Sequence, residues 1–285
     1  MAIIDLPMAG KICLVTGATA GIGEATASGL ASLGATVILA GRNIERCSAS
    51  VERIKQWTRN PEIAYLVADL SSQREVRRLA DEFKTRYARL DVLVNNVGAI
   101  NLARRFTEDG IELTFALNHL SYFLLTDLLI DLMISSAPAR IVNVSSSSHR
   151  QIGMNLENLQ GQGRYRGFRA YAQSKLGNVL FSYELARRLE GTGVTANALH
   201  PGVVATRFLC NNGKIGPIFS FFFGLRGISP SEGALTSIYL ASSNEMEGIT
   251  GGYYEKSRAV RSADASYDED TAARLWEISA EMTAE

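Results

Sequence analysis

The sequence predicts an α/β protein with a doubly wound parallel sheet, helices on both faces and a single domain over residues 1–285. Apolar, strand-like runs alternate with segments of helical periodicity along nearly the whole chain, and this alternation is typical of parallel sheets. The first such run leads into a glycine-rich turn and then a helical pattern, which is the order of a phosphate-binding βαβ unit. No stretch of linker composition divides the chain.

The expected elements follow one another in regular order. An apolar run from Lys11 forms the first strand, and further strands are expected near 36–40, 62–67, 91–94, 140–145 and 194–199, with a last one at 249–254. The helical patterns cover 22–33, 43–58, 72–87, 107–134 and 171–190, with a final helix at 270–278. Ligands of such folds bind beyond the carboxyl ends of the strands, so the residues that follow each strand are the site candidates.

The composition narrows the function classes. The 29 basic side chains balance the 29 acidic ones to a formal net charge of zero, so no sequence-independent attraction to nucleic acid is expected. The cysteines are scattered and show neither a disulfide framework nor metal-ligand spacing: Cys13, Cys47 and Cys210. The histidines are widely spaced, so we expect structural roles and no metal: His119, His149 and His200.

The glycine-rich turn has the spacing Gly-x-x-x-Gly-x-Gly, with Gly17, Gly21 and Gly23 before a helix that starts near Ile22. Glycines allow a tight turn and the close approach of a pyrophosphate, whose charge is met by the free amides and the positive dipole end of the helix. Such turns also occur for purely steric reasons. The second buried strand completes a βαβ unit of the expected length, which favours a dinucleotide site that includes Thr19 and Ile22.

The residues after the second strand indicate which dinucleotide binds. A site for NAD usually offers a carboxylate there to the ribose 2′-hydroxyl, whereas this chain has Gly41-Arg42-Asn43. Arg42 would neutralise a 2′-phosphate and Asn43 could add a hydrogen bond, so the predicted cofactor is NADP(H). The alternative is an arginine that simply ends the strand in solvent, and the missing acid argues against it.

A tyrosine and a lysine stand four residues apart in Tyr171-Ala172-Gln173-Ser174-Lys175, within reach of one another on one helix face. A phenol with a pKa near ~10 donates a proton poorly at neutral pH, and an adjacent ammonium favours the phenolate and lowers that pKa. We therefore expect Tyr171 to be a general acid or base whose pKa is lowered by Lys175. A lone pair of this kind is usually an ordinary surface pair, and the glycine turn upstream favours the catalytic interpretation.

Further motifs follow in a specific order: Asp69-Leu70, Asn95-Asn96-Val97-Gly98, Asn118, Asn143-Val144-Ser145-Ser146 and Pro201-Gly202-Val203-Val204-Ala205-Thr206. With the glycine turn and the Tyr–Lys pair, they make the chain resemble a classical short-chain dehydrogenase/reductase, and within that superfamily its retinol dehydrogenase-like branch. The resemblance covers nearly the whole chain and implies a Rossmann-type fold. Val97 is a departure, because the family most often has alanine there.

The resemblance also implies roles for individual residues. Tyr171 is the acid or base, Lys175 also hydrogen-bonds the nicotinamide ribose, and Ser146 holds the substrate oxygen. Ser146 is chosen from a run of four serines because the family's serine is the second after Asn143-Val144. Asn118 bends its helix and takes part in a proton relay through a water. The implied cofactor contacts beyond the glycine turn are Asp69, Leu70, Asn95, Val97, Gly98, Tyr171, Lys175, Pro201, Gly202, Val204 and Thr206.

Two segments are expected to shape the substrate pocket. One is an arginine-rich insertion at 149–170, and the other is a phenylalanine-rich segment at 208–228, where the family has its mobile lid. Phe219 and Phe222 are expected to contact the substrate, which predicts a lipophilic, retinoid-like or long-chain aldehyde, ketone or alcohol. Packing of these phenylalanines into the core or against a second subunit is equally favoured, and contact with a membrane surface is a weaker alternative.

These predictions describe an NADP(H)-dependent oxidoreductase that transfers a hydride between the nicotinamide and a carbonyl or alcohol. One alternative is a reductase of conjugated double bonds, as in the protochlorophyllide reductases, and another is a scaffold that senses NADPH without turnover. By analogy with the superfamily, the long helices at 107–134 and 171–190 predict a homodimer.

The first residues and the hydropathy of the sequence indicate the cellular location of the protein. Many animal members of the resembled branch carry a membrane anchor. Residues 1–10 lack the basic flank and the long apolar stretch of a secretory signal, and no stretch is judged to approach the ~20 apolar residues of a membrane span. We therefore expect a cytoplasmic protein without a membrane span.

Overall fold

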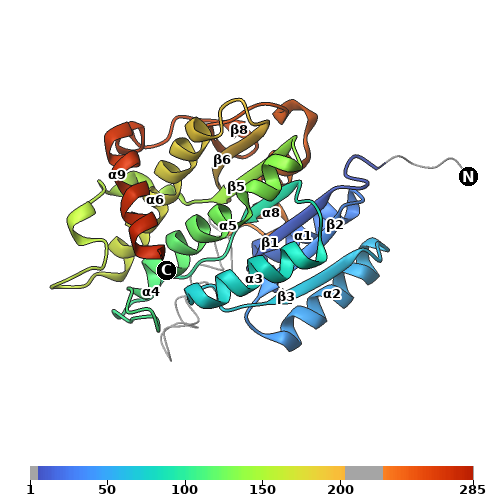
Figure 1. The fold of residues 1–285 in the computed structure, drawn as a ribbon, viewed down its shortest axis with the longest axis horizontal. Helices are drawn as coiled ribbons and strands as arrows, with labels where there is room; N and C mark the ends of the chain where they lie inside the picture. The colour runs from blue at the N-terminus through green and yellow to red at the C-terminus, as the bar shows by residue number, and fades with distance from the viewer. Residues whose placement is uncertain (1–5, 203–226, 285) are drawn as a thin grey trace, which may run out of the picture.

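One sheet with the strand order β3-β2-β1-β4-β5-β6-β7-β8 organises the molecule (Figure 1). The structure, a computed structural model, describes residues 6–202 and 227–284. Neighbouring strands are parallel from β3 to β7, and β8 pairs antiparallel with β7. The strands are β1 (Ile12–Thr16), β2 (Thr36–Gly41), β3 (Ile63–Val67), β4 (Val92–Asn95), β5 (Ala139–Val144), β6 (Val194–His200), β7 (Tyr253–Glu255) and β8 (Arg258–Ala259).

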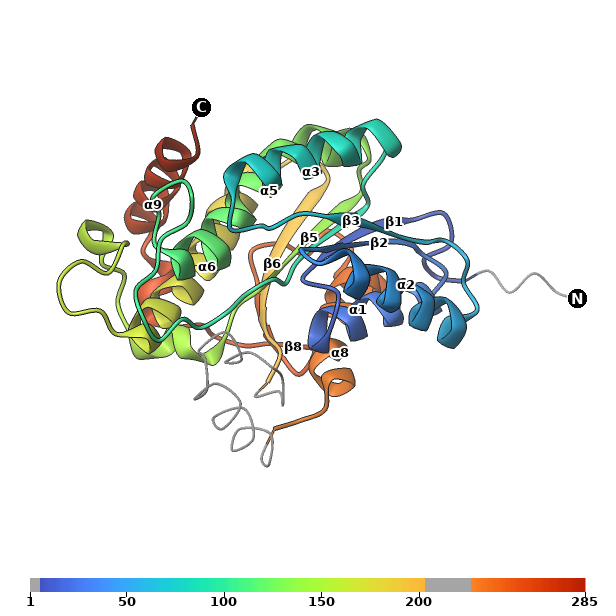
Figure 2. The ribbon, with the colours of Figure 1, turned by 90° about the horizontal axis from the view of Figure 1, so that it is seen from below.

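Helices cover both faces of this sheet. Figure 2 shows α3, α5 and α6 on one side of it and α1, α2 and α8 on the other. The helices are α1 (Gly21–Ser32), α2 (Ile44–Thr58), α3 (Gln73–Arg86), α4 (Leu113–Phe115), α5 (Ser121–Ser135), α6 (Gly167–Arg188), α8 (Pro230–Ser242) and α9 (Glu269–Thr283). Shorter helical turns are η1 (Ala116–Leu120), η2 (Ser147–Gln151), η3 (Leu156–Asn158), η5 (Asn244–Met246) and η6 (Asp264–Tyr267). The predicted doubly wound α/β fold is confirmed.

The strand order reverses between β1 and β4, which flank one another at the centre of the sheet. In doubly wound sheets, ligands bind beyond the carboxyl ends of the strands at such a switch point. The glycine turn follows β1 and the Asn95–Gly98 segment follows β4, so the fold places both predicted cofactor segments beside this point.

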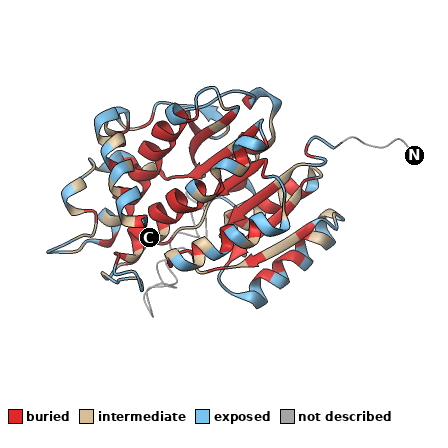
Figure 3. Ribbon diagram, in the orientation of Figure 1, coloured by how far each residue is buried: buried red, intermediate tan, exposed pale blue. Residues whose placement is uncertain are grey.

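The core consists of two apolar layers, one on each side of the sheet. In β1, Leu14 belongs to the layer under α3, α5 and α6, whereas Cys13 and Val15 belong to the layer under α1, α2 and α8. This alternation is what a strand buried on both faces requires. Figure 3 shows α5 and α6 buried along most of their length, so Tyr171 and Lys175 lie on one of the most buried helices.

Several boundaries differ from the sequence-based prediction. The expected helix at 107–134 begins at Leu113, and its first part contains the π-helical turn η1 before α5. Helix α6 begins at Gly167 rather than at Tyr171. Its first residue passes very close to another loop, because a Cβ at Gly167 would overlap the Asn101 carbonyl oxygen. The last strand is shorter than expected, with β7 starting at Tyr253.

Helix α8 was not predicted, although the sequence contains its start signal. The Ser229 hydroxyl accepts from the Glu232 amide, and the Glu232 carboxylate accepts from the Ser229 amide, which is a capping box. Pro230 occupies the first turn, where its missing N–H costs nothing.

Helix α9 packs across the outer side of α6 and α5. The Trp276 ring lies 4.9 Å from the Phe123 ring and 5.7 Å from the Phe181 ring, measured between centroids. Ala272 and Leu275 of the same helix join a buried apolar cluster with residues of α6. The chain's own last helix therefore covers part of the two helices that were expected to meet a partner, and the homodimer stays a prediction.

One helical stretch passes a length and composition test for a membrane span. It covers Leu113–Ser135, and 72% of its most apolar window is buried inside the protein. The expectation that no stretch approaches a span was therefore wrong as stated. Core helices of soluble proteins pass the same test, so this stretch is weak evidence for a span.

Candidate active site

The glycine turn between β1 and α1 is shaped by close backbone contacts. Gly17 and Gly21 have φ angles of +65° and +60°, a region that favours glycine. A Cβ at Gly23 would overlap the Gly17 carbonyl oxygen and would lie 2.5 Å from the Nδ2 atom of Asn96. The turn therefore depends on its glycines.

Thr16 and Asn96 hold this turn to the segment after β4. The Thr16 hydroxyl oxygen accepts from the backbone amides of Asn96 and Val97, at 2.8 and 3.1 Å. The Asn96 side chain donates to the Thr16 carbonyl oxygen at 2.8 Å. Neither residue was assigned a role from the sequence, although Asn96 stood in a motif that was noticed. Their bonds fix the distance between the two cofactor segments.

The residues present fit the pyrophosphate of a dinucleotide. No side chain caps the N-terminus of α1 at Ala20, and the glycine turn lets backbone approach a ligand at the positive end of that helix. At the end of β2, a Cβ on Gly41 would lie 2.6 Å from the Thr19 side chain. The segment that follows β2 therefore begins in close contact with the glycine turn. Arg42 follows it with an exposed side chain.

Asn43 has a structural task in addition to its predicted cofactor contact. Its amide oxygen accepts from the Arg46 backbone amide at 2.8 Å and caps α2. This capping accounts for an asparagine at this position without any ligand. Its contact with a cofactor stays a prediction.

Of the implied cofactor residues in the segment after β4, Gly98 lies at the catalytic residues and the Asn95 side chain does not. Gly98 lies at the catalytic residues, because a Cβ there would be 3.4 Å from both the Asn118 amide oxygen and the Lys175 nitrogen. Asn95 instead turns its side chain into the protein, where it donates to Thr126 and Asn143 at 3.0 and 2.9 Å. An interior bond network of this kind braces β4 against β5, so the side chain of Asn95 does not belong to the crevice.

Asp69 and Leu70 follow β3 at the same edge of the sheet. The Asp69 carboxylate accepts from the amide and the hydroxyl of Ser71 at 3.0 and 2.8 Å, and Leu70 is buried. Pro201 and Gly202 follow β6, and Gly202 has a φ of +92°. The remaining predicted contacts lie outside the described residues, as does most of the predicted lid at 208–228: Val204, Thr206, Phe219 and Phe222.

Tyr171 and Ser146 meet at the carboxyl end of β5. Both side chains are buried, and burial raises the pKa of Tyr171 to about 12 while a hydrogen bond with the Ser146 hydroxyl acts in the opposite direction. The Ser146 hydroxyl also accepts from the Ser148 amide at 3.3 Å. Ser145 differs, because its hydroxyl donates to the Lys175 carbonyl oxygen inside the protein at 2.7 Å. The Ser145 hydroxyl is thus used inside the protein, whereas the Ser146 hydroxyl faces Tyr171. The prediction from the sequence chooses Ser146 of these two.

Lys175 is expected from the spacing to lower the pKa of Tyr171, whereas burial raises this pKa in the structure. Its ammonium donates to the Val144 carbonyl oxygen at 2.8 Å and lies 6.0 Å from the centre of the Tyr171 ring. Burial lowers the pKa of Lys175 to about 7, so its charge is itself weakened near neutral pH. Burial is the dominant influence on both groups.

Asn118 lies at the centre of the π-helical turn η1 and is fully buried. Its amide group bonds both the N–H and the C=O of Ala99, each at 2.9 Å, and donates to the Ser174 hydroxyl at 3.0 Å. Ser174 in turn donates to the Tyr171 carbonyl oxygen at 2.7 Å. Single π turns often occur at functional sites. The π turn thus lies at the position where the resemblance implies a bend, and the Asn118 side chain ties the loop after β4 to the catalytic helix.

The insertion at 149–170 is anchored by a buried carboxylate. The Tyr165 hydroxyl donates to Glu112 at 2.9 Å, and Glu112 also accepts from the amides of Thr114 and Phe115 at the start of α4. The Glu112 amide donates to the Gln160 side chain at 3.0 Å. These bonds fix the insertion beside the loop that leads from β4 to Asn118.

The assembled side chains are suited to acid–base chemistry on an oxygen atom. A buried phenol and a serine hydroxyl share one hydrogen bond at a strand end, and a lysine of the same helix lies beside Gly98 of the segment after β4. Within residues 6–202 and 227–284, no group of three or more His, Cys, Asp or Glu side chains could hold a metal ion. The absence of a metal requirement stays a prediction.

Known proteins resemble this chain along most of its length. The sequence family described as short chain dehydrogenase matches residues 11–214. Human retinol dehydrogenase 14 is 41% identical over 295 aligned residues, which cover 96% of this chain and 87% of that protein. Human polyprenol dehydrogenase is 41% identical over 284 residues, which cover 97% and 86%.

Solved structures agree with these sequence relatives. An uncharacterized protein from Mycobacterium paratuberculosis superimposes with a TM-score of 0.80 at 32% identity, covering 98% of this chain and 96% of that one. A short chain dehydrogenase from Escherichia coli CFT073, complexed with NADPH, superimposes with a TM-score of 0.69 at 25% identity, covering 89% and 99%.

Proposed function

The chain belongs to the short chain dehydrogenase family, in its retinol dehydrogenase-like branch, and from this premise we propose that it is an NADP(H)-dependent reductase of lipophilic carbonyl compounds. The observation that carries the proposal is the buried phenol of Tyr171 hydrogen-bonded to Ser146, on the same helix as Lys175, whose ammonium lies beside Gly98. Fold alone does not identify a reaction, whereas this set of groups has a definite chemistry.

The protonation state of Tyr171 favours the reductive direction. With a pKa of about 12, the phenol keeps its proton at neutral pH, as the acid of a carbonyl reduction must before the reaction. A pKa this high also makes it a weak donor, so efficient transfer to a substrate oxygen requires the pKa to fall in the reacting complex. Ser146 orients the same oxygen, because its hydroxyl already pairs with that of Tyr171. Asn118 and Ser174 hold the backbone around Tyr171 in place. A bound NADPH supplies the hydride.

The preference for NADP(H) over NAD(H) rests on the residues after β2. This position carries Arg42 and no acid, so a 2′-phosphate would meet a cation and a 2′-hydroxyl would lack its usual carboxylate partner. The NADPH complex of the Escherichia coli relative supports the same choice.

The substrate class rests on relatives and on composition. Two relatives are named for retinol and polyprenol, which are lipophilic alcohols. The phenylalanines at 219 and 221–223 add an apolar segment to this chain. We therefore place the reactive carbonyl on a long or bulky apolar molecule.

A substrate panel followed by nicotinamide absorbance tests the proposal. We expect NADPH to be preferred over NADH, kcat/KM to rise along a series of aldehydes of increasing chain length, and retinal to be reduced to the alcohol. Replacing Arg42 by Ala should raise the KM for NADPH by about 10- to 100-fold, as the loss of charge-assisted hydrogen bonds would, with little change for NADH.

The same panel separates the alternatives. Product analysis with enones distinguishes reduction of the carbonyl from reduction of the double bond. NADPH binding without turnover on any carbonyl or alcohol would establish the sensing scaffold instead. A flat chain-length profile would remove the lipophilic substrate and leave the rest of the proposal intact.

A further inference from the structure

His149, three residues after Ser146, is a fully buried imidazole with a backbone partner on each ring nitrogen. Its Nδ1 atom lies 2.6 Å from the Ser146 carbonyl oxygen, and its Nε2 atom lies 3.0 Å from the amide nitrogen of Ala263. A carbonyl can only accept and an amide N–H can only donate. The proton is therefore on Nδ1, which donates to Ser146, and Nε2 accepts from Ala263.

These bonds fix the peptide that carries the Ser146 side chain. The Ser146 carbonyl oxygen accepts from both the backbone amide and the ring of His149, at 3.1 and 2.6 Å. The Ser146 hydroxyl accepts from the amide of Ser148 in the same turn, η2. A rotation of this peptide would move the Ser148 amide that donates to the Ser146 hydroxyl, so the direction of the hydroxyl depends on the turn that the imidazole holds.

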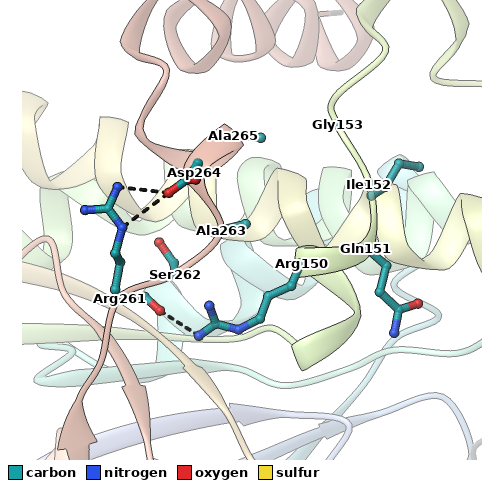
Figure 4. Close-up of a pocket in the computed structure, with 9 residues that line it drawn as sticks. All are labelled: Arg150, Gln151, Ile152, Gly153, Arg261, Ser262, Ala263, Asp264 and Ala265. Carbon is teal, nitrogen blue, oxygen red and sulfur yellow. Dashed lines mark hydrogen bonds and ion pairs between the residues drawn. The ribbon is translucent and has the colours of Figure 1, made fainter.

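The His149 ring links the Ser146 carbonyl to the Ala263 amide, and Ala263 belongs to a segment far along the chain. Figure 4 shows Arg261–Ala265 lying opposite Arg150–Gly153 across a groove, with the Arg150 guanidinium reaching the Arg261 carbonyl oxygen at 2.6 Å. The His149 bond to Ala263 therefore ties the serine turn to the segment that precedes α9.

The surroundings keep this imidazole neutral, as its two bonds require. Burial lowers the pKa of His149, and the nearby charges of Arg150 and Glu255 act in opposite directions. The Tyr253 ring packs against the imidazole at 4.7 Å between centroids, and the Arg150 guanidinium lies over the same Tyr253 ring. A protonated ring would point an N–H at the Ala263 N–H.

We propose that His149 is a positioning residue for Ser146, acting through the hydrogen bond from Nδ1 to the Ser146 carbonyl. The inference rests on the proposed function, because it assumes that Ser146 orients the substrate oxygen. His149 would touch neither substrate nor cofactor, and it would set the position of Ser146, which contacts the substrate.

Three substitutions separate the two hydrogen bonds. In His149→Asn the side-chain nitrogen takes the place of Nδ1 and keeps the bond to Ser146, whereas in His149→Gln the amide oxygen takes the place of Nε2 and keeps the bond to Ala263. His149→Phe retains a ring against Tyr253 and loses both. Tyr253→Leu is the matched control, because it removes the ring contact and leaves both hydrogen bonds.

The readout is the single-turnover rate of carbonyl reduction with the best substrate of the panel, beside the Kd for NADPH and the melting temperature. We expect the rate to fall about 10- to 100-fold in His149→Phe and His149→Gln, since a misplacement of about 1 Å has such an effect. His149→Asn and Tyr253→Leu should stay within about threefold of the parent. The Kd for NADPH should not change.

Two outcomes would overturn the inference: equal rates in the Asn and Gln variants, or rates in all variants that simply follow the melting temperature. If His149 had a purely structural role, keeping the bond to Ser146 or the bond to Ala263 would have the same effect on the rate. Ser146→Ala separates this failure from that of the proposed function. If Ser146→Ala is as active as the parent, the proposed function of Ser146 is wrong. If Ser146→Ala is inactive and His149→Phe is fully active, only the role of His149 is wrong.

Discussion

The Lys175 ammonium donates its hydrogen bond to the Val144 carbonyl oxygen at 2.8 Å, and it lies 6.0 Å from the centre of the Tyr171 ring. The charge thus lies between the end of β5 and the face of the phenol ring. Both groups are buried, and burial disfavours the charged form of each, which gives a pKa of about 12 for Tyr171 and about 7 for Lys175. These two shifts have opposite effects on stability as pH changes.

Replacement of Lys175 by Met should change how stability depends on pH. The folded pKa of about 7 lies below the ordinary value of 10.5, so between these two pH values the unfolded chain binds a proton that the folded chain lacks. The free energy of unfolding of the parent should therefore rise over that window, relative to the variant. Urea unfolding at a series of pH values measures the difference. Parallel curves for parent and variant would show that Lys175 keeps its ordinary pKa.

Replacement of Tyr171 by Phe should remove most of the activity and leave cofactor binding intact. The lost proton donor contributes about 10²- to 10⁴-fold to the rate in general acid catalysis, so kcat should fall within that range. The Kd for NADPH should change by less than about threefold, because the ring remains. Steady-state kinetics and a fluorescence titration of NADPH measure the two quantities.

The control for Tyr171 is Tyr183→Phe. Tyr183 is a buried tyrosine of the same helix whose hydroxyl pairs with Ser262 at 2.7 Å, away from the catalytic groups. Its variant reports the loss of a buried tyrosine hydroxyl alone. Equal activity of Tyr171→Phe and Tyr183→Phe would exclude Tyr171 as the acid.

The parts of the site that the sequence predicted are local patterns. The glycine turn, the asparagine within a helical pattern at Asn118 and the Tyr171–Lys175 spacing are each properties of short segments, and the alternation of strands and helices fixes where their ends lie. The fold class followed from the same alternation. Such features need no knowledge of which distant segments meet.

The missed features depend on contacts between distant segments. The pKa direction of Tyr171 is set by burial, and the direction of the Lys175 ammonium is set by a carbonyl 31 positions away in the sequence. The bridge from His149 to Ala263 spans 114 positions, so a lone histidine gave no signal of it. Helix α8 is different, because its capping box is formed by Ser229 and Glu232, three residues apart, and is readable in the sequence.

Replacement of Gly23 by Ala should impair the cofactor turn. The new Cβ would overlap the Gly17 carbonyl oxygen and approach the Asn96 side chain to 2.5 Å, and backbone cannot yield as a flexible side chain does. We expect the Kd for NADPH to rise at least about tenfold, with a lower melting temperature, since overpacking costs about 1–3 kcal/mol. Gly153→Ala is the control, because a Cβ there meets nothing within 4 Å. Tight NADPH binding by Gly23→Ala would contradict the close approach.

Replacement of Tyr165 by Phe should loosen the insertion without touching the catalytic groups. It removes the hydroxyl that donates to the buried Glu112 at 2.9 Å and so leaves that carboxylate with one partner fewer. Loss of one such bond costs about 1–3 kcal/mol. If the insertion walls the substrate pocket, this should appear as a raised KM for long-chain carbonyls, with kcat and the Kd for NADPH nearly unchanged.

The comparison that decides this last prediction uses short and long aldehydes together. A short aldehyde makes few contacts beyond its reacting carbon, so its KM should not respond to Tyr165→Phe, while that of a long one should. Arg164→Ala changes the neighbouring residue of the same insertion, away from the carboxylate, and should leave both substrates unaffected. A fall in kcat that is equal for both substrates would mean that the Glu112 anchor acts on Asn118 through α4 rather than on the pocket wall, because Glu112 also holds the amides of Thr114 and Phe115 just before the π turn.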